Sequence, residues 1–156
     1  LVNRKGGELM QKNLELLGPI KYTDEEVKFA KEIQASTGKP QLGLDSSIKP
    51  LRETLENPGG GSTDVGDVSW NVPNINLGVT TAPVDTPWHS WAVVACGGMS
   101  IGHKGTIYAA KAMAMTMSDL FKNKKLVQEI NQEYLERKGD EEYVAMIDGP
   151  APINEN

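Results

Sequence analysis

The sequence is poor in cysteine: Cys96 is the single one among 156 residues, so no disulfide can form within the chain. This thiol belongs to the apolar run 92–96, where we expect a small buried hydrophobic side chain rather than a reactive nucleophile. A secretory signal peptide is not recognisable either. Both absences favour a reducing, cytoplasmic environment.

Long hydrophobic runs and an excess of positive charge are also missing. No apolar stretch approaches the ~18 residues of a membrane-spanning helix, so we expect no membrane segment. The chain has 16 Lys and Arg against 21 Asp and Glu, a net charge of -5, and without a basic stripe nucleic acid is not an expected partner. At 38% hydrophobic and 24% charged, its 156 residues suit one ordinary domain with a core.

Histidine is scarce as well, since the chain has only His89 and His103. His89 lies in a loop stiffened by Pro87 and flanked by Trp88 and Trp91. A lone histidine beside tryptophans is more often structural than a ligand, although a neutral imidazole suits zinc, nickel, cobalt or manganese. One histidine cannot hold a metal ion alone, so the residues by themselves leave both interpretations open.

The glycine-rich segment 59–70 brings hydroxyl and carboxylate groups into one stretch of chain. Asp64 and Asp67 are three residues apart, so their carboxylates share a face only in a helix, and the glycines argue against a helix. One interpretation is a glycine turn whose aspartates bind their own backbone amides; the other is a ligand-binding loop. The preceding stretch 57–61 equally fits a flexible linker or a loop that approaches a ligand.

The hydrophobic pattern predicts an α/β fold in which helices pack on a small mixed sheet. Apolar residues recur at helical spacing in four stretches, which are 7–17, 23–38, about 104–122 and 125–138. Alternation predicts half-buried strands at 68–72 and 75–79. The apolar run 91–96 predicts a buried strand, with a buried helical turn as the alternative.

Two local features of the predicted helices can be tested directly. Thr23 and Glu26 have the spacing of a capping box at the start of a helix. The helix from about residue 104 carries an apolar row for which core packing is the favoured explanation; its members are Ala110, Met113, Ala114, Met117, Leu120 and Phe121.

Three segments, GSTDVGDVSW at 61–70, DTPWHSW at 85–91 and SIGHKG at 100–105, resemble a known family. They are similar to the C-terminal part of the zinc-dependent amidohydrolases and metallopeptidases related to aminoacylase and glutamate carboxypeptidase, closest to the p-aminobenzoyl-glutamate hydrolase branch. The resemblance implies that His89 binds one of two divalent metal ions, zinc or alternatively manganese. It implies substrate-binding roles for Ser62, Thr63, Asp64 and His103, the last holding a substrate carboxylate together with Lys104 and free helix amides.

The same resemblance implies a large missing part. The His-x-Asp segment, the bridging aspartate and the Glu-Glu pair of the family have no counterpart, so no catalytic residue is assigned. The chain begins at Leu1 rather than at methionine. We expect residues 1–156 to be the C-terminal part of the catalytic domain, without the N-terminal metal-ligand half and without the lid or dimerisation domain.

The whole enzyme is then expected to hydrolyse the amide bond of an N-acyl amino acid or an aminobenzoyl-glutamate-like molecule, as a homo-oligomer, whereas this chain alone is expected to be inactive. The alternatives are a non-catalytic α/β module that binds a partner or a small acid, and a split enzyme completed by another chain. The enzyme interpretation predicts that His89 lies on a cleft floor beside the 62–64 loop. It also predicts an unusually large exposed apolar surface, because the missing half would cover it.

Overall fold

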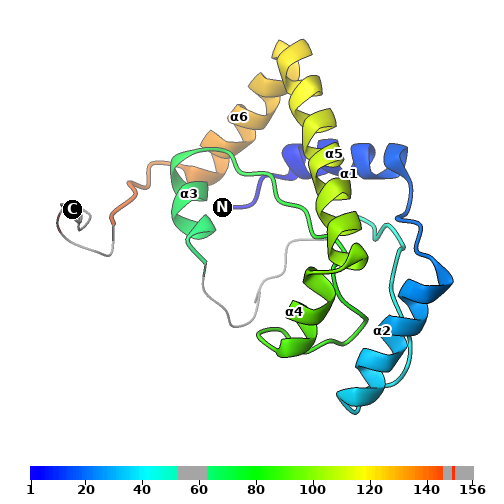
Figure 1. Ribbon diagram of the computed structural model, residues 1–156. Helices are drawn as coiled ribbons and strands as arrows, with labels where there is room; N and C mark the ends of the chain where they lie inside the picture. Colours follow the sequence, from blue (N-terminus) through cyan, green and yellow to red (C-terminus); the bar gives the residue numbers. More distant parts are fainter. Residues whose placement is uncertain (53–62, 146–148, 150–156) are drawn as a thin grey trace, which may run out of the picture.

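The computed structural model describes residues 1–52, 63–145 and 149 and is all-helical over these residues. The predicted α/β fold with a small mixed sheet is therefore wrong, because no strand occurs in the described part of the chain. The helices, in chain order, are α1 (Arg4–Leu17), α2 (Asp24–Ser36), α3 (Val65–Asn71), α4 (Trp91–Gly97), α5 (Ser100–Lys122) and α6 (Lys124–Lys138) (Figure 1).

The long helices form where periodicity and capping residues agree, which confirms the predicted helices. At α2 the capping box is complete, since Thr23 Oγ1 accepts from the amide of Glu26 and the Glu26 carboxylate accepts from the amide of Thr23. Helix α1 starts earlier than predicted, because the Asn3 side chain accepts a hydrogen bond from the Gly6 amide at 2.8 Å. Gly18, with φ 71°, ends this helix.

The predicted strands have other structures. The segment 68–72 lies in α3 and at its C-cap, and 75–79 has no regular secondary structure. The run 91–96 lies in α4, so the helical alternative is the correct one there. In so short a segment apolar residues at i, i+2 and i+4 fit a helix as well as a strand, since i and i+4 also share a helical face.

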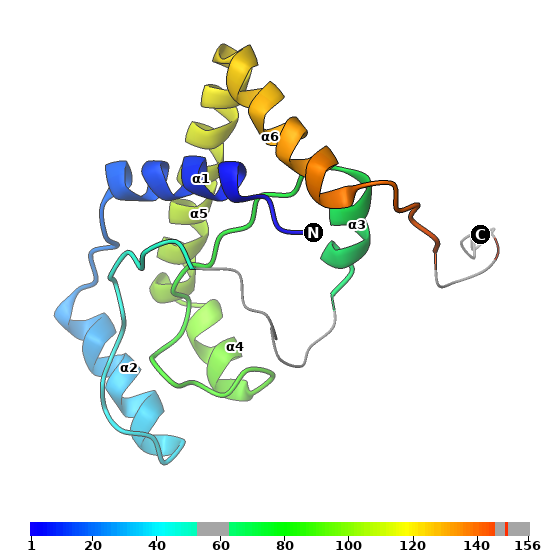
Figure 2. The ribbon, with the colours of Figure 1, turned by 180° about the vertical axis from the view of Figure 1, so that it is seen from behind.

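Helices α1, α5 and α6 form the larger packed group. In Figures 1 and 2, α1 runs across α5, while α5 and α6 meet at Asn123 like the two arms of a V. Helix α1 contacts both arms, and α4 contacts α5. The start of α1 is also tied to α6, because Asn3 Nδ2 donates to the carbonyl of Ile130 at 2.8 Å.

A small second core joins α2 to α4. Ile33, Ala92 and Cys96 are buried together, and Phe29, Ala82 and Ala95 pack around them. Cys96 is fully buried, as predicted, and burial raises the pKa of its thiol. Cys96 is therefore a packing residue and not a nucleophile.

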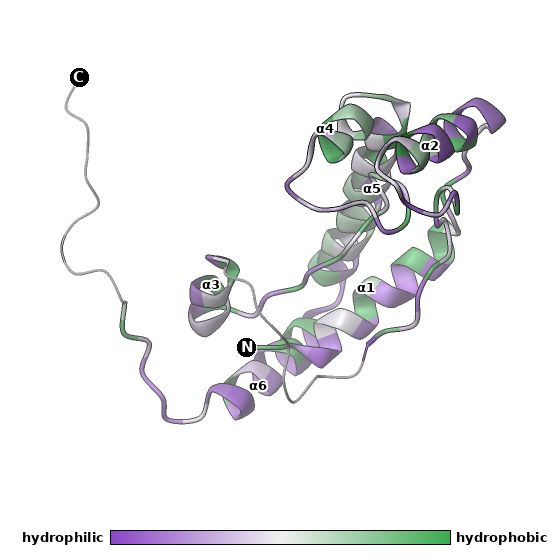
Figure 3. Ribbon diagram, turned by 90° about the horizontal axis from the view of Figure 1, so that it is seen from below, coloured by the Kyte–Doolittle hydropathy of each residue, from purple (hydrophilic) through white to green (hydrophobic). Residues whose placement is uncertain are grey.

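The apolar row of α5 is exposed except for the half-buried Leu120, which corrects the prediction that the row packs in the core. Exposed fractions reach 55% for Met117 and 85% for Phe121. The buried side of α5 consists instead of Ile101, Gly102, Gly105, Ala112 and Thr116. Figure 3 shows that hydrophobic residues also predominate in α4, where Val94 is 75% exposed.

Exposed apolar side chains are common throughout the described residues. Ten apolar residues are buried there, whereas seventeen large ones are exposed. A helical domain normally buries the apolar stripe of each surface helix. Of the helices in residues 1–52 and 63–145, none has the length and hydropathy needed to cross a membrane.

Candidate functional site

His89 lies on a tight loop that leads into α4. Its backbone has φ 61° and that of Asp85 has φ 57°, both in the left-handed region that non-glycine residues rarely adopt. The Thr86 hydroxyl donates to the carbonyl of Pro83 at 2.7 Å, and the Ser90 hydroxyl donates to that of Pro87 at 2.5 Å. Two consecutive turns therefore fix the loop, and the strained backbone at His89 motivates a functional interpretation.

The loop is anchored to α2 through a buried amide. The side chain of Gln34 donates to the carbonyl of Val84 at 2.9 Å and accepts from the amide of Gly43 at 2.7 Å. The amide of Val84 in turn donates to the carbonyl of Gly43 at 3.0 Å. These three hydrogen bonds hold Val84, five residues before His89, against α2 and Gly43.

The imidazole of His89 is exposed, as are the neighbouring side chains of Trp88 and Trp91. An exposed imidazole is available to a metal ion. Within the described residues, however, no group of three or more His, Cys, Asp or Glu side chains could hold one. His89 thus fits the role of a single ligand, and the rest of a site would need donors from outside this set.

Thr63 and Asp64 are exposed at the start of α3, and Ser62 lies outside the described residues, as does the 57–61 stretch. Asp64 is the N-cap residue, but its carboxylate makes no capping hydrogen bond. Because 65–71 is helical, the argument from glycine against a helix was wrong, and Asp64 and Asp67 do lie within one helical turn. The two carboxylates differ in their hydrogen bonds: that of Asp67 accepts from the Tyr143 hydroxyl at 2.9 Å, whereas that of Asp64 does not cap its helix.

Helix α3 is held from the side of α6. The Tyr134 hydroxyl of α6 donates to the carbonyl of Trp70 at 2.9 Å. The hydrogen bond to Asp67 raises the pKa of Tyr143. These two hydrogen bonds attach α3 at Asp67 and Trp70.

His103 lies exposed in the first turns of α5, where its amide donates to the carbonyl of Met99 at 3.0 Å. Its neighbour Lys104 is already engaged: Nζ lies 2.6 Å from Oε2 of Glu26 and 2.9 Å from the carbonyl of Lys21. The expected cooperation of His103 and Lys104 in holding a substrate carboxylate is therefore not seen, because Lys104 binds a carboxylate of the protein itself.

The structure does not bring the predicted residues into one cluster. Helices α3 and α4 lie apart in Figures 1, 2 and 3, and with them Asp64 and the turn of His89. The turn of His89 leads into α4, and α4 contacts α5, the helix that carries His103. The two histidines therefore belong to neighbouring elements. That Asp64 and His89 share a cleft floor stays a prediction for the complete protein.

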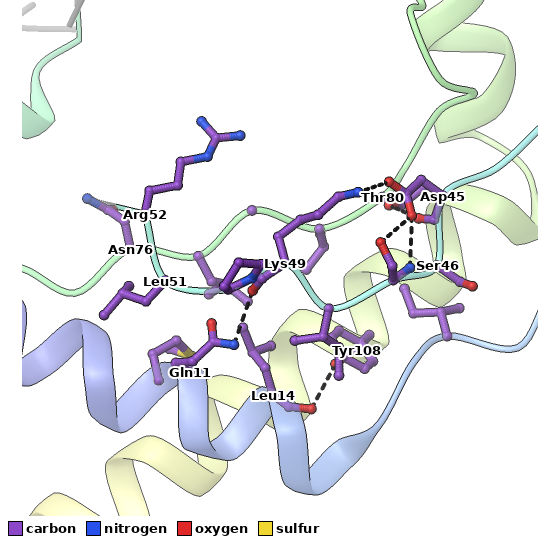
Figure 4. Close-up of a pocket in the computed structure, with 18 of the residues that line it drawn as sticks. Gln11, Leu14, Asp45, Ser46, Lys49, Leu51, Arg52, Asn76, Thr80 and Tyr108 are labelled. Carbon is purple, nitrogen blue, oxygen red and sulfur yellow. Dashed lines mark hydrogen bonds and ion pairs between the residues drawn. The ribbon is translucent and has the colours of Figure 1, made fainter. Parts of the chain in front are cut away.

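A hollow that sequence reasoning missed lies between α1, the segments 45–52 and 76–80, and Tyr108 of α5 (Figure 4). Its volume is about 540 Å³. Lys49 is paired with Asp45 at 2.6 Å, and the Lys49 carbonyl accepts from Gln11 at 3.1 Å. The hydrogen bonds from Lys49 and Ser47 lower the pKa of Asp45. The polar groups are largely satisfied by one another, and none of the predicted site residues lines the hollow.

A second hollow of about 770 Å³ adjoins the first, because both are lined by Asp45, Arg52, Val79 and Thr80. It extends to Trp88, the residue before His89. Asp45, which lines both hollows, accepts a hydrogen bond from the amide of Ser47. An Asp two residues before a Ser is a sequence pattern typical of such a turn, but the pattern does not predict a hollow.

Comparison with known proteins gives one informative similarity. The chain is 35% identical over 159 aligned residues to a subunit of the p-aminobenzoyl-glutamate hydrolase of Escherichia coli (strain K12), and the match covers 86% of this chain. The chain spans only about a third (33%) of the length of that relative. No family model matches the sequence, and no solved structure matches the fold. The chain is thus a distant homologue of one part of this hydrolase subunit.

Proposed function

We propose that this chain forms part of a metal-dependent amidohydrolase that cleaves the amide bond of an N-acyl amino acid or an aminobenzoyl-glutamate-like substrate. The observation that carries the proposal is the similarity of 86% of the chain to a p-aminobenzoyl-glutamate hydrolase subunit. Because that relative is named as a subunit, we expect further chains or further copies in the complete enzyme.

His89 is the proposed ligand of the divalent ion, zinc or manganese. Its support is chemical: an exposed imidazole on a fixed, strained loop, next to a hollow that reaches Trp88. A bound metal ion supplies Lewis-acid activation of water and of the amide carbonyl. Because the described residues offer no complete donor set, no catalytic step is assigned to this chain.

Substrate contacts are proposed for the hydroxyl and carboxylate groups at the start of α3 and for His103. Thr63 and Asp64 are exposed, and the Asp64 carboxylate makes no capping hydrogen bond to its own helix. These hydroxyl and carboxylate groups can accept hydrogen bonds from a substrate amide, and a ring N–H of His103 can donate one to a substrate carboxylate. Ser62 belongs to the same proposal.

A chimera tests the proposal. The matching third of the Escherichia coli relative is replaced by the aligned residues of this chain, and hydrolysis of p-aminobenzoyl-glutamate and the bound metal are measured. We expect activity above that of the relative lacking this third, and we expect His89→Ala to remove both activity and one metal equivalent. Lys39→Ala, an exposed change that also lines the second hollow, is the control and should keep the metal. A folded chimera whose metal content and activity are indifferent to His89→Ala would contradict the proposal.

The rival is a non-catalytic module that binds a partner or a small acid, and the hollow beside Tyr108, which none of the predicted site residues lines, is the observation that favours it. The chimera also separates the two functions. If this chain is a non-catalytic module, the chimera should be inactive even when the chimera folds and binds metal.

A further inference from the structure

Residues 85–90, the His89 turn, include two non-glycine residues with left-handed backbone. Asp85 has φ 57° and His89 has φ 61°. Such a backbone persists only where the surrounding structure over-determines it. The two hydroxyl hydrogen bonds of the turn join residues within 83–90 only, so they shape the turn without placing it on the fold. The placement must therefore come from contacts at the two ends of the turn.

Both ends of this turn are attached to α2, at two residues that are adjacent in the sequence. Before the turn, the side-chain amide of Gln34 donates to the Val84 carbonyl at 2.9 Å. After the turn, Ile33 is buried together with Ala92 and Cys96 of α4. Figures 1, 2 and 3 show α4 beside α2. One short stretch of α2 therefore holds the chain on both sides of the turn.

The side chain of Gln34 is enclosed by the fold and uses both its donor and its acceptor. It is 1% exposed, and its Oε1 accepts from the amide of Gly43 at 2.7 Å in a buried hydrogen bond. An apolar side chain here would leave the Val84 carbonyl and the Gly43 amide without these partners, and the loss of a buried partner is costly. The hydrogen bond that remains, from the Val84 amide to the Gly43 carbonyl, does not reach α2.

We propose that Gln34 is a positioning residue for His89, and that it sets the metal affinity of the site by fixing where the His89 turn lies on the fold. The inference rests on the proposed function, in which His89 binds the divalent ion. Gln34 acts through the backbone, because its hydrogen bond is to Val84 and not to the imidazole. Ile33 supports the same turn from the other end by packing.

The first experiment tests the turn by NMR in the 156-residue chain without metal. The one-bond coupling between Cα and Hα of His89 reports the sign of φ. We expect a left-handed value in the wild type and a shift toward that of negative φ in Gln34→Met, whose side chain has a similar length but no amide. A left-handed value that persists in Gln34→Met overturns the proposal.

Asn13→Leu is the matched control. Asn13 is also 1% exposed, and its amide donates to Thr116 and Asp119, but these hydrogen bonds join α1 to α5. The control therefore loses a buried amide without touching the attachment of the His89 turn. We expect its coupling at His89 to match the wild type, and an equal shift in both variants overturns the proposal.

Gln34→Glu is the second variant, and it takes the place of Gln34→Met if that protein does not fold. An ionised carboxylate still accepts from the Gly43 amide, but it has no N–H for the Val84 carbonyl. We expect the same shift of the coupling at His89. Circular dichroism shows which variants are folded under the conditions of the measurement.

The second experiment measures zinc affinity in the chimera by competition with a chelator. We expect Gln34→Met to raise the dissociation constant at least about tenfold, as the loss of groups that orient a metal ligand does, whereas Asn13→Leu should leave it unchanged. Affinity that depends on His89 but not on Gln34 overturns this inference alone. Affinity that is indifferent to His89→Ala overturns the proposed function and the metal role of Gln34 with it, and the NMR result then still decides whether Gln34 holds the turn.

Discussion

Lys104 of α5 and Glu26 of α2 form an ion pair with 2.6 Å between Nζ and Oε2. The Glu26 side chain is only 8% exposed, and it also completes the capping box of α2. Lys104 adds a contact with the ring of Tyr22 at 5.8 Å. This one carboxylate therefore both starts a helix and joins it to another.

Loss of that carboxylate should lower stability. We expect Glu26→Gln to reduce the free energy of unfolding by about 1–3 kcal/mol, because Lys104 and the Thr23 amide lose a charged acceptor. Glu32→Gln is the control, since Glu32 and Lys28 form an exposed pair at 3.9 Å and should contribute almost nothing. Urea unfolding of the three proteins measures the effect, and an equal loss in both variants would contradict the role of Glu26.

The stabilisation by Glu26 should depend on pH. Burial acts to raise the pKa of Glu26, but hydrogen bonds from Lys104, Ser100 and Thr23 outweigh it, so the folded-state pKa is lowered. The difference between the wild type and Glu26→Gln is then full above the unfolded-state pKa of about 4.3 and is lost as pH falls through the lower folded-state value. Urea unfolding at a series of pH values checks the direction, and a difference that grows on acidification would refute it.

Glu133 should stabilise the start of α1 from outside that helix. Its two carboxylate oxygens accept from the amides of Arg4 at 2.9 Å and Lys5 at 2.7 Å, and Arg137 donates to it at 2.8 Å. We expect Glu133→Ala to cost about 1–2 kcal/mol, as the loss of a helix cap does. Glu129→Ala, which removes only an exposed pair with Lys125, serves for comparison. Thermal unfolding that gives the same midpoint for both variants would contradict the capping role.

The elbow between α4 and α5 should not tolerate a side chain at residue 102. A Cβ on Gly102 would overlap the Gly97 carbonyl and lie 2.6 Å from the Gly97 Cα, so the backbone would have to move. We expect Gly102→Ala to destabilise the fold by about 2 kcal/mol or more. Gly98→Ala in the same elbow meets only an ordinary contact at 3.8 Å and should be nearly neutral. Denaturant midpoints distinguish the two, and a neutral Gly102→Ala would show that the elbow is looser than described.

The 156-residue chain alone should have no amidase activity. Within its described residues no complete group of metal donors exists. An assay of p-aminobenzoyl-glutamate hydrolysis with added zinc or manganese checks this. Turnover that a chelator abolishes would refute it.

The sequence predicted helices where capping and periodicity agree, as in α2 with its capping box. It failed where one short apolar segment fits both periods, as in 68–72 and 91–96. It also failed for the orientation of α5, for a physical reason. Tight packing uses small residues such as Gly102, Gly105 and Ala112, so the buried side of this helix is the less hydrophobic one.

The candidate site was predictable only residue by residue. His89 was found from a stiff loop and a resemblance, and its left-handed backbone adds a reason that the sequence does not contain. The engagement of Lys104 by Glu26 and of Asp67 by Tyr143 was not predictable, because each pair joins segments more than 70 residues apart. Such contacts depend on the tertiary arrangement and leave no local pattern.

The capping of α1 by α6 has a consequence for synthesis of the chain on the ribosome. Asn3 and Ile130 are separated by 127 residues, and Arg4 and Glu133 by 129. At 5–20 residues per second, α1 emerges roughly 6–26 s before the side chain that caps its start exists. The local cap by Asn3 can form at once, but the amides of Arg4 and Lys5 have no Glu133 acceptor until α6 is made, so a nascent chain stalled before Glu133 leaves these two amides without it.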